Sequence, residues 1–228
     1  MVGRRPTIRR LTVDIRRVAR ELPGREELRA RARGLAVLDA VICPEWERRY
    51  YSYDSKWGEE EELASMRTGS GDESSIVFGP AGVYIRFFSS DSPFNPYSHG
   101  PAEKVLQQIP EVFGEYVSEP AFYGEGFPLV TAAAWRIIDQ ASWAFAPDGD
   151  LVEARDVGDI IALLLATNGP EEYIRYAEEI HEATLDPVVV AAVYNGESMS
   201  EEMVRSLNSG ASMESLAEDI EEIGYPMH

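Results

Sequence analysis

Residues 50–88 read YYSYDSKWGEEEELASMRTGSGDESSIVFGPAGVYIRFF, and this stretch decides the fold class. Its aromatic and β-branched residues gather in short runs, and turn residues separate the runs. The turn Gly79-Pro-Ala-Gly82 between two apolar runs is typical of a β-hairpin. We therefore predict four antiparallel strands between residues 45 and 90. Two later apolar runs, at 130–138 and 142–146, are predicted to complete the sheet through a tight turn near Asp139.

Helical periodicity surrounds this sheet on both sides. Apolar residues recur at helical spacing before and after Pro23-Gly24, so the chain is predicted to begin with a basic helical hairpin. A further helical segment is expected at 102–117, with a restart at Pro110, and Val112, Phe113 and Tyr116 are expected to face the core. From residue 151 onward the pattern predicts only helices.

The last third of the chain also carries capping signals. Asp186 followed by Pro187 is typical of a helix N-terminus, and Ser200 and Ser212 are predicted to cap two later helices. Gly224 is predicted to end the last helix.

These patterns together predict an α+β protein. It has an antiparallel β-sheet of about four to six strands, an N-terminal helical hairpin and a C-terminal helical region. We divide the chain into a basic helical N-terminus (1–43), an antiparallel sheet domain (44–150) and an acidic helical region (151–228). We expect the three parts to pack as one globular unit.

Charge is distributed unevenly along the chain. The 228 residues carry a net charge of −19, yet residues 1–34 hold 11 arginines and 4 acidic residues, a net charge of +7. The acidic excess therefore belongs to residues 35–228. This balance argues against nucleic acid as a partner of the whole protein and favours either solubility or a basic protein partner. An alternative is a homo-oligomer, in which the basic start of one copy meets the acidic end of another.

Cysteine usage and hydropathy indicate the compartment. Cys43 is the single cysteine, so no intramolecular disulfide can form. No apolar run approaches the length of a membrane span, and the start of the chain lacks the layout of a secretory signal. We expect a cytoplasmic protein without a membrane partner.

The densest group of chemically versatile side chains lies in residues 50–73. Aromatic rings there offer contact area with polar tips, an arginine can bind a carboxylate or phosphate, and the glycine-rich turn can expose backbone N–H groups. For any single residue, core packing or a hairpin loop explains the pattern more often, and Trp46, Tyr50 and Trp57 are expected in the core. The candidate binding residues are Tyr51, Tyr53, Trp57, Glu59, Arg67, Asp72 and Glu73.

Parts of this sequence resemble known proteins. The string YYSYDSKWGEEEELASMRTGSGDES, with SPFNPY, EPAF and the closing SLAEDIEEIGY, is similar to a widespread family of bacterial proteins over most of residues 35–225. That resemblance implies no activity. The GSGDE turn before a strand also resembles the immunity proteins of Smi1/Knr4 type, which implies a protein partner.

Motifs for catalysis are sparse. The chain has three histidines and no zinc, nucleophile-elbow, phosphate-loop or dinucleotide motif, so no metal site and no cofactor is predicted. One fragment, Asp54-Ser-Lys56, matches half of a Mg²⁺-dependent nuclease site, for which Asp39 or Glu45 would supply a second ligand.

Two hypotheses about function follow. The first is a non-catalytic protein-binding module that uses residues 50–73 and acidic surfaces, with a toxin-neutralising immunity protein as a concrete form. The alternative is a carboxylate-based Mg²⁺-dependent hydrolase or nuclease that uses Asp54 and Lys56. The acidic run Glu59–Glu62 and the acidic C-terminal helices are explained by solvated surfaces or by a basic partner.

Overall fold

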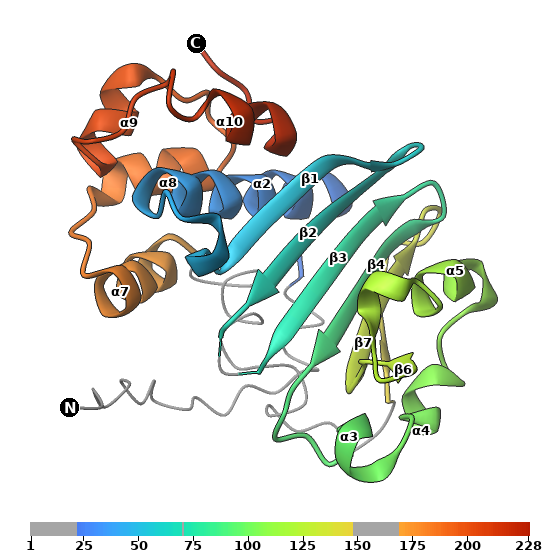
Figure 1. Ribbon diagram of the computed structural model, residues 1–228. Helices are drawn as coiled ribbons and strands as arrows, with labels where there is room; N and C mark the ends of the chain where they lie inside the picture. Colours follow the sequence, from blue (N-terminus) through green and yellow to red (C-terminus); the bar gives the residue numbers. More distant parts are fainter. Residues whose placement is uncertain (1–21, 70, 148–168) are drawn as a thin grey trace, which may run out of the picture.

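The computed structural model describes residues 22–69, 71–147 and 169–228. Six strands form one antiparallel sheet in the order β1-β2-β3-β4-β7-β8 (Figure 1). The strands are β1 (Tyr51–Gly58), β2 (Glu61–Arg67), β3 (Glu73–Gly79), β4 (Gly82–Phe88), β7 (Ala132–Ile137) and β8 (Ala144–Ala146). The predicted fold class and all six predicted strands are confirmed. Residues 11–21 of the first predicted helix and the predicted helical segment 151–168 lie outside the described residues.

The turn between β3 and β4 depends on a glycine. Gly79 pairs with Gly82 at the end of the hairpin, and Gly82 has a φ of 138°. A Cβ at this position would lie 2.1 Å from the carbonyl oxygen of Arg136 on the neighbouring strand β7. Only glycine permits both the backbone angle and this close approach.

Helices cover one face of the sheet. Helix α2 (Arg25–Ile42) lies behind the first strands, and α8 (Pro187–Tyr194), α9 (Glu201–Leu207) and α10 (Ala217–Ile223) lie beside α2, with α7 (Gly169–His181) below them (Figure 1). Residues 34–41 of α2 are all buried, because the sheet covers one side of the helix and the C-terminal helices cover the other. The helix predicted from residue 25 to 43 is confirmed.

The sheet is buried on both faces at its centre. In β3 and β4, Ile76, Phe78 and Ile85 pack into the core beneath the long helices. The alternate residues Val77 and Tyr84 pack into a second core on the opposite face. Successive side chains of a strand point to opposite faces of the sheet. Because a core covers each face here, the sequences of β3 and β4 contain continuous apolar runs.

Short elements cover the second core. They are α3 (Pro96–His99), α4 (Glu103–Leu106), α5 (Gly114–Val117), the 3-10 turns η2 (Glu111–Phe113) and η3 (Pro120–Phe122), and the small hairpin β5 (Tyr123–Gly124) and β6 (Phe127–Pro128). The sequence predicted neither α3 nor the β5–β6 hairpin.

The helical segment expected over 102–117 consists of α4, η2 and α5, and the expected restart at Pro110 is confirmed, because proline cannot continue a helix from the preceding turn. Phe113 and Tyr116 are buried as predicted, but Val112 is 52% exposed and its predicted core position is wrong. A 3-10 turn aligns residues three apart, so Phe113 and Tyr116 share the inward side and Val112 faces solvent.

Three of the four predicted helix ends in the C-terminal region are confirmed. The side chain of Asp186 accepts a hydrogen bond from the N–H of Val188, and Ser200 Oγ accepts one from the N–H of Met203. Gly224 ends α10 in the left-handed conformation, with a φ of 66°. The predicted cap at Ser212 is wrong, because α10 begins only at Ala217 and Ser212 belongs to the turn before it.

Within the three described ranges, none of the helices is both long enough and apolar enough to span a bilayer.

Candidate functional site

The seven candidate binding residues lie in three separate places. Tyr51 and Tyr53 are buried beneath the long helices, which corrects the expectation that they contribute to one surface patch. Trp57 stacks on Phe122 at the edge of the second core, and Glu59 is exposed in the turn between β1 and β2. Arg67, Asp72 and Glu73 lie at the opposite end of the same strands.

At that opposite end, Arg67 and Glu73 are partners in register across β2 and β3. Glu73 forms a 2.8 Å ion pair with Arg86, whose guanidinium also donates to the carbonyl oxygen of Leu129 and lies over the ring of Phe122. Asp72 accepts a hydrogen bond from the N–H of Ser90. These contacts fix the loops at this end of the sheet and use both carboxylates internally.

A buried carboxylate joins three elements beneath the sheet. Asp39 of α2 is 0% exposed, and one of its oxygens accepts hydrogen bonds from the N–H groups of Tyr50 and Tyr51 at 2.8 and 2.9 Å. The hydroxyls of Tyr173 and Tyr176 on α7 donate to the same carboxylate at 2.7 and 3.2 Å. Asp39 therefore connects α2, the start of β1 and α7.

This environment shifts the ionisation of Asp39. Burial disfavours its charged form and raises the pKa to about 6, although the four hydrogen bonds oppose that shift. The hydroxyl of Tyr176 also lies 2.9 Å from Nε2 of His181, whose pKa is lowered by burial and by Arg48. The four hydrogen-bond donors to Asp39 all belong to this chain, and two of them are hydroxyls of α7. Asp39 therefore holds α7 against α2 and the start of β1.

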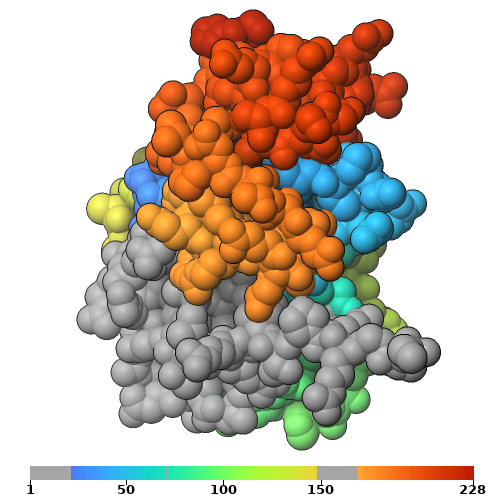
Figure 2. All heavy atoms as spheres, turned by 90° about the vertical axis from the view of Figure 1, so that its left-hand side faces the viewer, coloured from blue at the N-terminus to red at the C-terminus, as the bar shows by residue number. Residues whose placement is uncertain are grey.

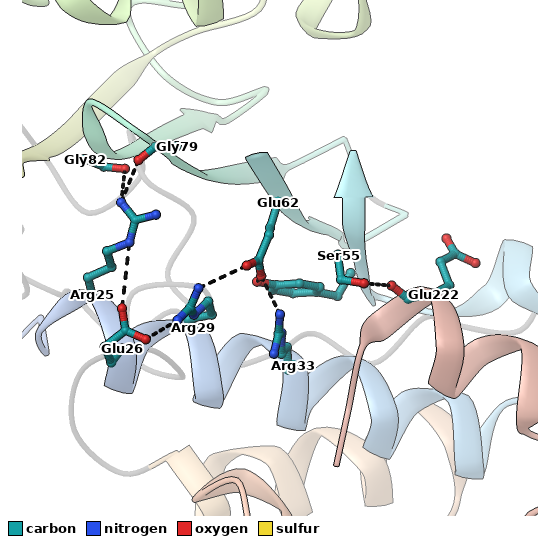
Figure 3. Close-up of polar contacts among 10 residues, drawn as sticks. Arg25, Glu26, Arg29, Arg33, Ser55, Glu62, Gly79, Gly82 and Glu222 are labelled. Atoms are coloured by element: carbon teal, nitrogen blue, oxygen red, sulfur yellow. Dashed lines mark hydrogen bonds and ion pairs between the residues drawn. The ribbon is translucent and has the colours of Figure 1, made fainter. Parts of the chain in front are cut away.

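A half-buried carboxylate fastens α2 to the sheet. Glu62 of β2 accepts hydrogen bonds from Arg29 at 3.0 Å and Arg33 at 2.7 Å, and from the hydroxyl of Tyr53 (Figure 3). Burial alone would raise the pKa of Glu62, but Tyr53 and the two guanidiniums outweigh it and lower the pKa. Glu62 is thus a structural member of the acidic run, not a solvated charge.

The arginines of α2 therefore serve the fold. Arg25, at the start of the same helix face, donates to the carbonyl oxygens of Gly79 and Gly82 at 2.6 and 3.0 Å, which ties α2 to the β3–β4 turn (Figure 3). Arg31 forms an ion pair with Glu27 at 2.5 Å. In the described part of the basic N-terminus, these positive charges meet carboxylates or carbonyl groups of the same chain.

Acidic side chains instead gather where α10 meets β1. We define the β1–α10 face as Asp54, Lys56, Asp219, Glu221 and Glu222. Ser55 Oγ donates to the carbonyl oxygen of Glu222 at 2.7 Å, which brings strand and helix together (Figure 3). Lys56 pairs with Glu221 at 3.1 Å, and both side chains are exposed.

Like charges lie close together on the β1–α10 face. Burial raises the pKa of Glu222, and the neighbouring carboxylates of Asp54 and Asp219 raise it further, while Arg49 opposes them. Glu221 and Glu222 also lie in the last turn of α10, where the helix dipole disfavours negative charge. The sequence of α10, AEDIEEI, contains no basic residue to offset this arrangement.

The Asp54-Ser-Lys56 fragment is part of this face. Asp54 Oδ1 accepts a hydrogen bond from the backbone N–H of Lys56 at 2.8 Å, and the Lys56 ammonium is directed to Glu221. Asp39, one of the two acids considered as a second metal ligand, is buried among the tyrosines instead. Among the residues that the structure describes, no group of three or more His, Cys, Asp or Glu side chains is placed to hold a metal ion.

Sequence reasoning missed two features near this face. Trp46 was expected in the core but is 53% exposed, in the 3-10 turn η1 (Trp46–Arg48) between α2 and β1. Glu222 was one of many acids in the tail, and nothing in its local sequence distinguished it. The adjacent pair Glu221-Glu222 at a helix end that lacks Lys or Arg was the available signal.

Comparisons of the chain with protein-family models, with curated proteins and with solved structures found no match.

Proposed function

We propose that this chain is a non-catalytic protein-binding module that recognises a basic partner through the β1–α10 face. The observation that carries the proposal is the gathering of four carboxylates, those of Asp54, Asp219, Glu221 and Glu222, where β1 meets α10. Burial raises the pKa of Glu222, and the carboxylates of Asp54 and Asp219 raise it further. Such repulsion destabilises the free protein, and a cationic partner would relieve it. The largely exposed positions of Glu221 and Glu222 leave them accessible to that partner.

A toxin-neutralising immunity protein in the bacterial cytoplasm is one concrete form of this proposal. The resemblance of the GSGDE turn to proteins of Smi1/Knr4 type supports it, as does the buried free thiol of Cys43, which suits a reducing compartment. Occlusion of a basic active site requires complementary charge and no chemistry of its own.

Affinity capture with matched variants tests the proposal. The bait proteins are the wild type, a face variant (Glu221→Gln with Glu222→Gln) and a control variant (Glu178→Gln with Glu179→Gln). The control pair is likewise two adjacent exposed glutamates before an isoleucine near a helix end, but it lies on α7. We expect wild type and control to retain the same protein from the source cells and the face variant to lose it. Retention of that protein by the face variant would contradict the proposal.

A titration with MgCl₂ separates this function from the nuclease alternative. A binding module should show no saturable heat of Mg²⁺ binding. Saturable binding that Asp54→Asn abolishes would favour a carboxylate-based hydrolase instead.

A further inference from the structure

The surface next to the β1–α10 face presents an exposed tryptophan. Trp46 is 53% exposed, whereas Trp135 is buried and Trp57 and Trp143 are half-buried. Exposed tryptophans are uncommon because the ring carries a large apolar area, and tryptophan is enriched among the residues that dominate binding energy at protein interfaces. Trp46 is therefore a candidate contact residue for a protein partner.

The turn that carries Trp46 is held in a fixed position. Arg49 Nε donates to the carbonyl oxygen of Cys43 at 2.8 Å, and the N–H of Arg49 donates to the carbonyl oxygen of Trp46 at 3.1 Å. The same guanidinium donates hydrogen bonds to both carboxylate oxygens of Asp219 on α10, at 2.5 and 3.0 Å. Because these contacts exist before binding, a partner would not have to order the turn.

Arg49 also links the turn that carries Trp46 to the β1–α10 face. Trp46 begins the turn that Arg49 ends, and Arg49 contacts Asp219, a member of the β1–α10 face. Figure 2 shows the segment around the start of β1, in light blue, standing out beside the orange and red C-terminal helices. Within the turn, Glu45 and Glu47 are exposed on either side of Trp46. The opposing charges are Arg48, which lies 3.7 Å from Glu45, and Arg49, which is paired with Asp219.

An exposed indole next to two exposed glutamates, Glu45 and Glu47, suits a cationic side chain. A guanidinium or ammonium group placed over the indole gains a cation–π interaction, and tryptophan is the best of the aromatic rings for it. Glu45, Glu47 and the carboxylates of the β1–α10 face would attract the same group, whereas an apolar partner would have to bury those charges. The chemistry of this surface thus favours a basic segment over an apolar one.

We infer that Trp46 is the anchor for an arginine or lysine side chain of a basic partner segment, whose further positive charges lie against the β1–α10 face. This inference rests on the proposed function and names the residue and the chemistry that recognise the partner. The occupant is a segment of a different protein and not a second copy of this chain.

Titration calorimetry with a hexa-arginine peptide at low salt tests the inference. The variants are Trp46→Ala, Trp46→Phe and, as a control, Tyr97→Ala, which removes an aromatic ring that is 51% exposed elsewhere on the surface. We expect Trp46→Ala to weaken binding about tenfold, Trp46→Phe to weaken it less, and Tyr97→Ala to leave it unchanged. Hexa-citrulline, which keeps the shape without the charge, should not bind.

The outcomes separate this inference from the proposed function. Wild-type affinity of Trp46→Ala together with weak binding by the face variant would overturn the role of Trp46 and leave the acidic face in place. Wild-type affinity of both variants would overturn both proposals. Sedimentation velocity tests the remaining possibility, that the surface binds a second copy of this chain. A wild-type dimer that becomes monomeric in Trp46→Ala would overturn the inference.

Discussion

At the scale of single residues, two carboxylates hold the fold together by opposite electrostatic means. Glu62 faces two guanidiniums, so its charge is compensated, whereas Asp39 faces only neutral donors and stays costly to ionise. Burial without an opposing charge raises a carboxyl pKa, and a neighbouring cation lowers it. The two residues therefore respond differently to pH and to substitution.

Asp39 should make stability depend on pH. Its pKa is about 6 in the folded protein against 3.8 for the free side chain, so its stabilising contribution is fully present below pH 4 and is lost as the pH rises through about 6. We expect the unfolding free energy of the wild type, relative to Asp39→Asn, to fall by roughly 3 kcal/mol between these limits. Urea unfolding of both proteins across that range measures the difference. A constant difference would contradict the assignment.

Glu62→Gln should destabilise the protein by about 1–3 kcal/mol, because Arg29 and Arg33 lose a charged acceptor in a partly buried site. Glu59→Gln is the matched control from the same acidic run, and its exposed side chain predicts a change within about 0.5 kcal/mol. Thermal and urea unfolding at neutral pH compare the two. Equal effects would mean that Glu62 is only a surface charge.

At the scale of elements, the packing of α2 against α8 depends on Gly34. A Cβ at Gly34 would lie 2.6 Å from the carbonyl oxygen of Val193, which is backbone and cannot rotate away. We therefore expect Gly34→Ala to destabilise the protein by about 1–3 kcal/mol, although alanine is the better helix former.

Gly114→Ala is the control for this substitution. Gly114 begins α5 with a φ of −59°, and an added Cβ would meet nothing within 4 Å. Its replacement should be neutral or stabilise the protein by about 0.4–1 kcal/mol. Circular dichroism during urea unfolding reports both values, and a stable Gly34→Ala variant would show that α2 and α8 can separate.

Elements were predictable where a local pattern determines them. The apolar stripe of α2, the apolar runs of β3 and β4 and the cap at Asp186 are all set by residues close in sequence, and each was predicted. Helix α3 and the β5–β6 hairpin are too short to produce a period. The cap at Ser212 failed because a serine that bonds within a turn has the same local sequence as a serine that caps a helix.

The candidate site was less predictable than the fold for a tertiary reason. Tyr51 and Tyr53 alternate as strand residues do, but only the packing of α2 and α7 decides that they are buried. Conversely, Trp46 is exposed because Arg49 holds its turn against Asp219, which lies 170 residues further along the chain. Contacts over such separations leave no local pattern.

At the scale of the whole molecule, the basic and the acidic parts of the sequence use their charges differently. In the described part of the basic start, the arginines of α2 are committed to Glu62, Glu27 and backbone carbonyls. The acidic end leaves carboxylates of α10 together on the outer surface beside β1. The β1–α10 face thus carries four carboxylates against the single ammonium of Lys56, with Arg49 paired to Asp219 beside it.

The most direct test of this central claim is the stability of Glu222→Gln at two salt concentrations, with Glu179→Gln on α7 as the control. If Glu222 is repelled by Asp54, Asp219 and the end of α10, removal of its charge should stabilise the free protein by ~0.5 kcal/mol at about 20 mM NaCl. The gain should exceed that of Glu179→Gln and shrink at about 500 mM NaCl, where surface charges are screened. Unchanged or lower stability of Glu222→Gln at low salt would contradict the claim that this face holds an excess of negative charge for a partner.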